Sequence, residues 1–207
     1  MIIVAMVDEP VYNKNMNSVN ESAKRPVREK ILHTAHDLFY RDGIRATGVD
    51  KVIAESGVSK VTFYRHFPSK RDLILAYLDY RHHRWIHWFK EALARHGGKP
   101  GAGLKPLVAT LEEWFDSPLY RGCAFINTTA ELADTWPEAL EICRSHKRDM
   151  TLIIAELLPE SPDRMQLAQA AAVAVDGAII TAQLEQSSEN ASSALLSLAL
   201  ILQAIDL

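Results

Sequence analysis

Apolar residues recur every three or four positions along most of the chain, which is the period of an amphipathic α-helix. The first such run begins at Val27 and stops at Gly43, where a left-handed helix cap favours a residue without a side chain. Two shorter runs follow and end at Gly57 and Pro68. The pattern therefore predicts three helices within residues 27–67, the last two joined by a tight turn.

Longer helical patterns occupy the rest of the chain. One helix is expected from Ser69 towards residue 96, before a Gly- and Pro-rich loop at residues 97–101. Five further helices are predicted at residues 104–115, 123–132, 137–158, 162–186 and 190–205. Because neither paired strands nor an internal repeat can be recognised, the sequence predicts an all-α protein of about nine helices.

The same pattern predicts three regions along the 207 residues. Residues 1–23 are expected to be a flexible arm, residues 24–81 a three-helix head, and residues 82–207 a helical body. Within the head, residues 48–67 form the predicted helix-turn-helix. Hydrophobic residues make up 48% of the chain and charged residues 24%, which is typical of a globular protein. Two cysteines cannot form a disulfide framework and favour a cytoplasmic location, and no membrane span is predicted.

Charge is distributed unevenly between head and body. Residues 21–81 carry 12 Lys or Arg against 8 Asp or Glu, whereas residues 82–207 carry 10 against 16. A basic head on an acidic body indicates that the head contacts a polyanion.

The third predicted helix has one apolar and one polar face. If Phe63 points towards the core, an advance of 100° per residue brings Phe67 to the same side. The outward face and its edges then carry Lys60, Val61, Thr62, Tyr64, Arg65 and His66. This is the arrangement that offers a helix to the major groove of DNA, although a solvated face on a small helical hairpin would have the same pattern.

Each outward side chain has a plausible role on DNA. Arg65 can make a bidentate pair with guanine, and Val61 can contact a thymine methyl group. Phosphate contacts are expected from Lys60, Tyr64, His66 and Lys70. Ser59 is expected to cap the third helix, and Thr47 to cap the second.

A family resemblance favours the DNA interpretation. The residues that carry it are Arg28-Glu29-Lys30-Ile31-Leu32, Ala35, Leu38-Phe39, Gly43, Thr47, Val49, Ile53-Ala54, Gly57-Val58-Ser59-Lys60, Tyr64, His66-Phe67 and Ser69-Lys70. This segment resembles the DNA-binding domain of the TetR family of transcriptional regulators. The resemblance implies a three-helix DNA-binding head, a long fourth helix and a body that binds a ligand and dimerises.

The resemblance also implies which residues contact operator DNA. They are Ser59, Lys60, Val61, Thr62, Tyr64, Arg65, His66 and Lys70. Thr47 and Gly48 complete the predicted DNA surface, although Gly48 stands where the family often has Thr or Ser. Val61 stands where Gly is frequent, so no operator sequence is carried over.

The body offers residues for a largely apolar ligand pocket. Its expected walls and polar anchors are Trp85, Trp88, Trp114, Phe125, Asn127, Glu131 and His146. The alternative is that most of these aromatic residues are plain core. No cofactor and no metal site are predicted.

The last two helices are the predicted dimer interface. Leu195, Leu198, Leu202 and Ile205 form an apolar stripe, and two such helices from each subunit would form a four-helix bundle. A two-fold homodimer predicts a near-palindromic double-stranded operator.

Together these features predict a cytoplasmic, homodimeric transcriptional regulator. A repressor is favoured, released from its operator when a small, largely apolar effector tilts the long fourth helix. One alternative is a helical enzyme with an apolar substrate pocket, but no nucleophile with a suitable base is evident, so an enzyme is not predicted. Another is a DNA-organising protein that has no ligand.

Overall fold

The computed structural model describes residues 27–133, 135–185 and 188–206, so the predicted arm at residues 1–23 lies outside the described residues. The described part contains nine helices and no strand, which confirms the predicted all-α fold. The helices are α1 (Val27–Asp42), α2 (Val49–Ser56), α3 (Lys60–His66), α4 (Lys70–Arg95), α5 (Pro106–Phe115), α6 (Ala124–Leu132), α7 (Pro137–Leu157), α8 (Arg164–Glu185) and α9 (Ser188–Ile205).

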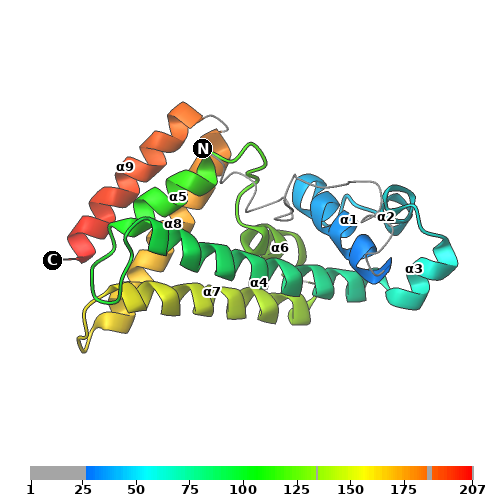
Figure 1. The fold of residues 1–207 in the computed structure, drawn as a ribbon, viewed down its shortest axis with the longest axis horizontal. Coiled ribbons are helices and arrows are strands. Elements are labelled where there is room, and N and C mark those ends of the chain that lie inside the picture. The colour runs from blue at the N-terminus through cyan, green and yellow to red at the C-terminus, as the bar shows by residue number, and fades with distance from the viewer. Residues whose placement is uncertain (1–26, 134, 186–187, 207) are drawn as a thin grey trace, which may run out of the picture.

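The arrangement is elongated (Figure 1). Helices α1–α3, called the head below, form one end, and α5, α8 and α9 form the other. Helices α4 and α7 run along the long axis. The short helix α6 packs against α7. The chain therefore places a small helical head at one end of a larger helical body.

Two glycines set the ends of helices in the head. Gly43 follows α1 with φ of 89°, and its N–H donates to the carbonyl of Phe39. Gly57 follows α2 with φ of 64°, and its N–H is shared between the carbonyls of Ile53 and Ala54. Both stops agree with the sequence pattern, because these left-handed conformations are strained for residues with a Cβ.

Helix α4 joins head and body. Its first turn is capped by Ser69, whose Oγ accepts the N–H of Asp72. Near that end Leu73 and Tyr77 are buried, and further along Trp85 and Trp88 are buried as well. With 26 residues at about 1.5 Å each, α4 extends for roughly 39 Å, so one continuous helix contributes to the cores of both regions.

Helix α8 packs between α7 and α9 in the body. Among the described helices it alone is long and apolar enough to cross a membrane, judged by length and composition. Core helices of globular proteins meet the same criterion, so this property carries little weight.

Helix α9 is apolar on two sides. Leu195, Leu198 and Leu202 are buried within the protomer, with exposed fractions of 8%, 1% and 2%. Their predicted role as the dimer stripe is therefore wrong, because they already pack against the rest of the body. Among the described residues, the large apolar side chains that α8 and α9 leave exposed are Met165, Val173, Ile180, Leu184, Leu196, Leu200 and Ile201.

Two histidines are buried as neutral groups. His36, on α1, is 1% exposed, and its Nε2 lies 3.2 Å from a guanidinium nitrogen of Arg81 on α4. Burial lowers the pKa of His36 to about 4, although its contact with Asp37 opposes the shift. Burial also lowers the pKa of His146 well below 6.5. Both folded side chains therefore resist protonation.

Acid should destabilise the protein in part through His36. Between pH 6.5 and about 4 the unfolded histidine binds a proton and the folded one does not, so stability falls with pH by about 1.4 kcal/mol per unit for this residue. Urea unfolding across this range should give a shallower pH dependence for His36→Gln than for the wild type. His87→Gln, at an exposed position, should keep the wild-type slope, and equal slopes in all three proteins would contradict the assignment.

Candidate nucleic-acid interface

The core of the head fixes which way α3 faces. Phe63 and Phe67 are 0% and 1% exposed, and their ring centroids lie 6.2 Å apart. On the other side Val61 is 70% exposed and Tyr64 is 42% exposed, and Arg65 is exposed as well. The predicted outward face is therefore confirmed as a solvent-facing surface.

The start of α3 is held by its N-cap. Ser59 Oγ accepts the N–H of Thr62 at 3.1 Å and lies 2.8 Å from the Thr62 hydroxyl, which confirms the predicted cap. The Thr62 hydroxyl therefore already has a protein partner. Lys60 Nζ lies 3.5 Å from Asp50 Oδ1 on α2, but both side chains are largely exposed. An exposed pair of this kind is weak, so Lys60 can exchange Asp50 for another anion.

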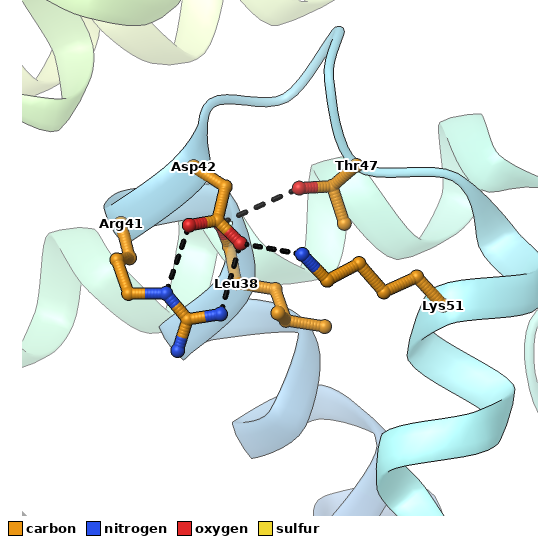
Figure 2. Close-up of polar contacts among 5 residues, drawn as sticks. All are labelled: Leu38, Arg41, Asp42, Thr47 and Lys51. Carbon is orange, nitrogen blue, oxygen red and sulfur yellow. Dashed lines mark hydrogen bonds and ion pairs between the residues drawn. The ribbon is translucent and has the colours of Figure 1, made fainter.

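Thr47 does not cap α2, contrary to the prediction. It is fully buried, and its Oγ1 donates to the carbonyl of Leu38 on α1 at 3.4 Å. The N-cap of α2 is Gly48, which offers no side-chain hydrogen bond. Thr47 cannot cap α2 because it precedes the N-cap residue and its side chain points towards α1 (Figure 2). Its side chain is therefore not part of the exposed surface.

An ionic cluster joins the end of α1 to α2 (Figure 2). The carboxylate of Asp42, the last residue of α1, lies 2.8 Å from Arg41 Nε and 2.9 Å from Lys51 Nζ on α2. Hydrogen bonds from these two cations hold the pKa of Asp42 below its ordinary value.

Lys70 also has a different environment from the one predicted. Its Nζ donates to the carbonyl of Ile44 at 2.6 Å and lies 6.0 Å from the centroid of the Phe39 ring. Burial lowers the pKa of Lys70. Its ammonium group therefore joins the start of α4 to the turn after α1. Because this group already has a protein partner, it is not free to bind a DNA phosphate as predicted.

Five of the predicted ligand residues have rings that form one packed cluster, in which the ring centroids of His146 and Trp85 lie 4.9 Å apart, whereas Asn127 and Glu131 line a separate cavity. Trp85, Trp88 and Trp114 pack against one another with centroids 5.5–6.0 Å apart, and all three are buried. His146 stacks on Phe125 with centroids 3.6 Å apart. For the tryptophans, the alternative interpretation as plain core fits this packing better than a pocket wall.

Two cavities lie next to α6. One, called the junction cavity, has a volume of about 900 Å³ and is lined from the head by Tyr40, Gly43 and Ile44 and from the body by Asn127 and Glu131, among others. Glu131 and Asn127 are thus the predicted ligand residues that line it.

The second, called the α6–α7–α8 cavity, has a volume of about 930 Å³. Its apolar wall includes Phe125, Ile126, Leu140, Leu152 and Met165. One side is formed by Lys147 on α7 and Asp176 on α8, joined by an ion pair of 2.5 Å. In the sequence Asp176 is a single charged residue within the apolar segment at residues 171–180, a pattern that does not reveal its partner Lys147 on the neighbouring helix.

Comparison with known proteins identifies relatives of this arrangement. Residues 31–77 match the family described as bacterial regulatory proteins, tetR family. The chain is 27% identical over 110 residues to an uncharacterized HTH-type transcriptional regulator in the lacX 3′ region of Lactococcus lactis subsp. lactis, a match covering 53% of this chain and 56% of that protein. It is 34% identical over 68 residues to the HTH-type transcriptional regulator QacR of Staphylococcus aureus, covering 32% and 36%. The matched segments thus span about half or less of these two relatives.

A solved structure matches over a longer range. The crystal structure of a TetR-family transcriptional regulator from Streptomyces coelicolor has a TM-score of 0.74 and 27% sequence identity, and the match covers 87% of this chain and 96% of that one. These matched proteins are all named as transcriptional regulators, which agrees with the prediction that the chain is not an enzyme.

The uncapped start of α2 suggests a stabilising substitution. Gly48 has an extended backbone with φ of −78°, and an added Cβ would meet nothing within 4 Å. A serine hydroxyl there can accept an N–H of the first turn of α2, whereas alanine cannot. Gly48→Ser should therefore be more stable than Gly48→Ala by about 1 kcal/mol in urea unfolding. Equal stability of the two variants would show that the hydroxyl does not cap the helix.

Proposed function

The chain belongs to the TetR family of bacterial regulatory proteins, and we propose that it is a homodimeric transcriptional regulator that binds operator DNA with the head. In this proposal residues 24–81 are the DNA-binding domain and residues 82–207 the ligand-binding and dimerisation domain. The observation that carries it is the exposed polar face of α3 on a well-packed helix-turn-helix. Such a regulator acts in the cytoplasm, where bacterial DNA lies.

Sequence is read by the middle of α3. Arg65 donates a bidentate pair to guanine, and Val61, which is 70% exposed, contacts a thymine methyl group. Phosphates are bound by the flanking residues Ser59, Lys60, Thr62, Tyr64 and His66 and by the backbone at Gly48. Thr47 and Lys70 support this surface from behind, because their side chains bond to Leu38 and Ile44.

The effector is a small, largely apolar molecule that occupies the α6–α7–α8 cavity. The aliphatic and aromatic side chains along its wall favour such a ligand, and the Lys147–Asp176 pair supplies a polar anchor. The proposed protein is a repressor, and effector binding in this cavity lowers its affinity for the operator. By reciprocity the operator must weaken effector binding by the same factor.

The dimer forms through α8 and α9, which together carry seven of the large exposed apolar side chains. An apolar surface of this kind is costly in water and is typical of a protein interface. A two-fold dimer then offers two copies of α3 to a near-palindromic operator.

Fluorescence anisotropy tests the function directly. The purified protein is titrated against its own upstream intergenic DNA and against a scrambled duplex over a salt series. Tight binding to the first duplex alone, weakening as salt is raised, is the expected result. Equal and weak binding to both duplexes at every salt concentration would contradict autoregulation by sequence-specific binding.

Two variants of α3 separate base reading from phosphate binding in that assay. Arg65→Ala should lose about 1–3 kcal/mol of discrimination between the two duplexes for each half-site, because it removes a bidentate base contact. Lys60→Ala should weaken binding to both duplexes alike and reduce the salt slope by about one for each phosphate that the lysine no longer neutralises. The assignment of roles is wrong when both variants lose discrimination equally.

The dimer interface has its own test. Leu200 on α9 is 70% exposed in the protomer, so Leu200→Glu should fold normally but should bury two uncompensated charges in a symmetric dimer. Its dimer dissociation constant should rise at least about a hundredfold in sedimentation equilibrium. The matched control is Leu119→Glu, at a 41% exposed position after α5, which should dimerise as the wild type does. An unchanged dimer in Leu200→Glu would exclude this face of α9.

A further inference from the structure

The carboxylate of Glu131, near the end of α6, holds the turn between α1 and α2. Its Oε1 accepts the N–H of Ile44 at 3.3 Å, and its Oε2 accepts the N–H of Arg45 at 2.7 Å. An added Cβ on Gly43 would lie only 3.5 Å from Oε1, so the carboxylate lies close against the backbone of the turn. A body residue therefore provides hydrogen-bond acceptors for two backbone groups of the head.

The same turn is held from a second direction. Lys70 Nζ, at the start of α4, donates to the carbonyl of Ile44 at 2.6 Å, and the charge of Glu131 raises the pKa of Lys70 against the effect of burial. The peptide backbone around Ile44 thus lies between a carboxylate and an ammonium group. Hydrogen bonds to charged groups are roughly twice as strong as neutral ones, so this turn is firmly positioned relative to the body.

Helix α6 also lines the proposed effector cavity. Phe125, Ile126, Thr129 and Ala130 belong to the wall of the α6–α7–α8 cavity, and Glu131 is the next residue along the same nine-residue helix. A short helix moves as a rigid unit, so a displacement imposed on its cavity-facing side chains is passed to the Glu131 carboxylate. The path from cavity to head is a single helix.

The junction cavity leaves room for this movement. This cavity of about 900 Å³ borders the contact between Glu131 and the turn on both sides. Gly43 and Ile44 line it from the head, and Glu131 lines it from the body. A carboxylate that leaves the turn can enter this space without displacing a packed side chain.

We propose that Glu131 is the positioning residue that couples effector binding to the head: its two hydrogen bonds hold the α1–α2 turn in the DNA-binding arrangement, and an effector that displaces α6 breaks them. The inference rests on the proposed function and specifies its regulation. A head released from Glu131 has more orientations relative to its partner head, and restricting them on the operator lowers affinity. The effector thus acts through α6 as well as through α4.

Operator binding without any ligand is the first test. Anisotropy is measured with a duplex selected from random DNA by the wild-type protein. Glu131→Ala should bind it about 5- to 150-fold more weakly, the usual range of coupling between two sites. The operator affinity of Glu131→Gln, which keeps one acceptor oxygen, should lie between those of the wild type and Glu131→Ala. The control Glu112→Ala, at an exposed position on α5, should bind as the wild type does, and all variants should keep the wild-type thermal midpoint within a few degrees.

The second test uses N-phenyl-1-naphthylamine, a neutral apolar fluorophore, as the probe for the α6–α7–α8 cavity. Its fluorescence should report tighter binding to Glu131→Ala than to the wild type, because the probe must break the two hydrogen bonds of Glu131 only in the wild type. The probe should lower operator affinity in the wild type and have little further effect in Glu131→Ala, since the hydrogen bonds it breaks are already absent. In the wild type it should also speed deuterium exchange in peptides covering residues 40–48 but not in those covering 53–60.

Two results would overturn the inference. One is wild-type operator affinity in Glu131→Ala, and the other is a probe effect of the same factor in Glu131→Ala as in the wild type. A probe that leaves wild-type operator binding unchanged counts against the proposed effector cavity, and the ligand-free comparison still decides the role of Glu131. A complete lack of sequence-specific binding by the wild type would instead overturn the proposed function.

Discussion

The structure depends on α4 packing into the hydrophobic core of the head and into that of the body at the same time. The first turns of α4 bury Leu73 and Tyr77 against the head, and its later turns bury Trp85 and Trp88 in the body. Because packing at either end fixes the rotation of the whole helix, neither region can repack without affecting the other. This constraint positions α3, whose own orientation follows from the burial of Phe63 and Phe67.

Polar contacts then specify how the head sits on the body. The guanidinium of Arg81, on α4, lies 4.0 Å from the centroid of the Tyr40 ring and contacts His36, and all three residues come from elements that meet at the junction. The Tyr40 hydroxyl in turn donates to the carbonyl of Gly122 and accepts the N–H of Arg121. Apolar packing tolerates small rotations, whereas breaking a buried hydrogen bond leaves a costly unpaired group. The junction thus favours a few discrete arrangements over a continuous range.

The sequence predicts those structural properties that are set by residues nearby in the chain. The number and order of the helices and the outward face of α3 follow from periodicity, because both depend on neighbours three or four residues away. The environments of Thr47 and Lys70 do not follow from periodicity. Thr47 bonds to Leu38 and Lys70 bonds to Ile44, and both contacts depend on how the turn between α1 and α2 folds. The dimer stripe on α9 was misassigned for a related reason. A helix with apolar residues on two sides carries no local signal of which side faces its own protomer.

The ligand residues illustrate the same limit and bear on how such a regulator responds. Sequence reasoning selected Glu131 as a polar anchor for a ligand, but its carboxylate contacts the backbone of Ile44 and Arg45 instead. In a two-fold dimer every such contact occurs twice, so the coupling free energies of the two protomers add and their effects on affinity multiply. A tenfold effect in each protomer, equal to about 1.4 kcal/mol, becomes about a hundredfold for the dimer. Two modest hydrogen bonds per protomer are therefore enough for a useful switch, and no large rearrangement of the core is required.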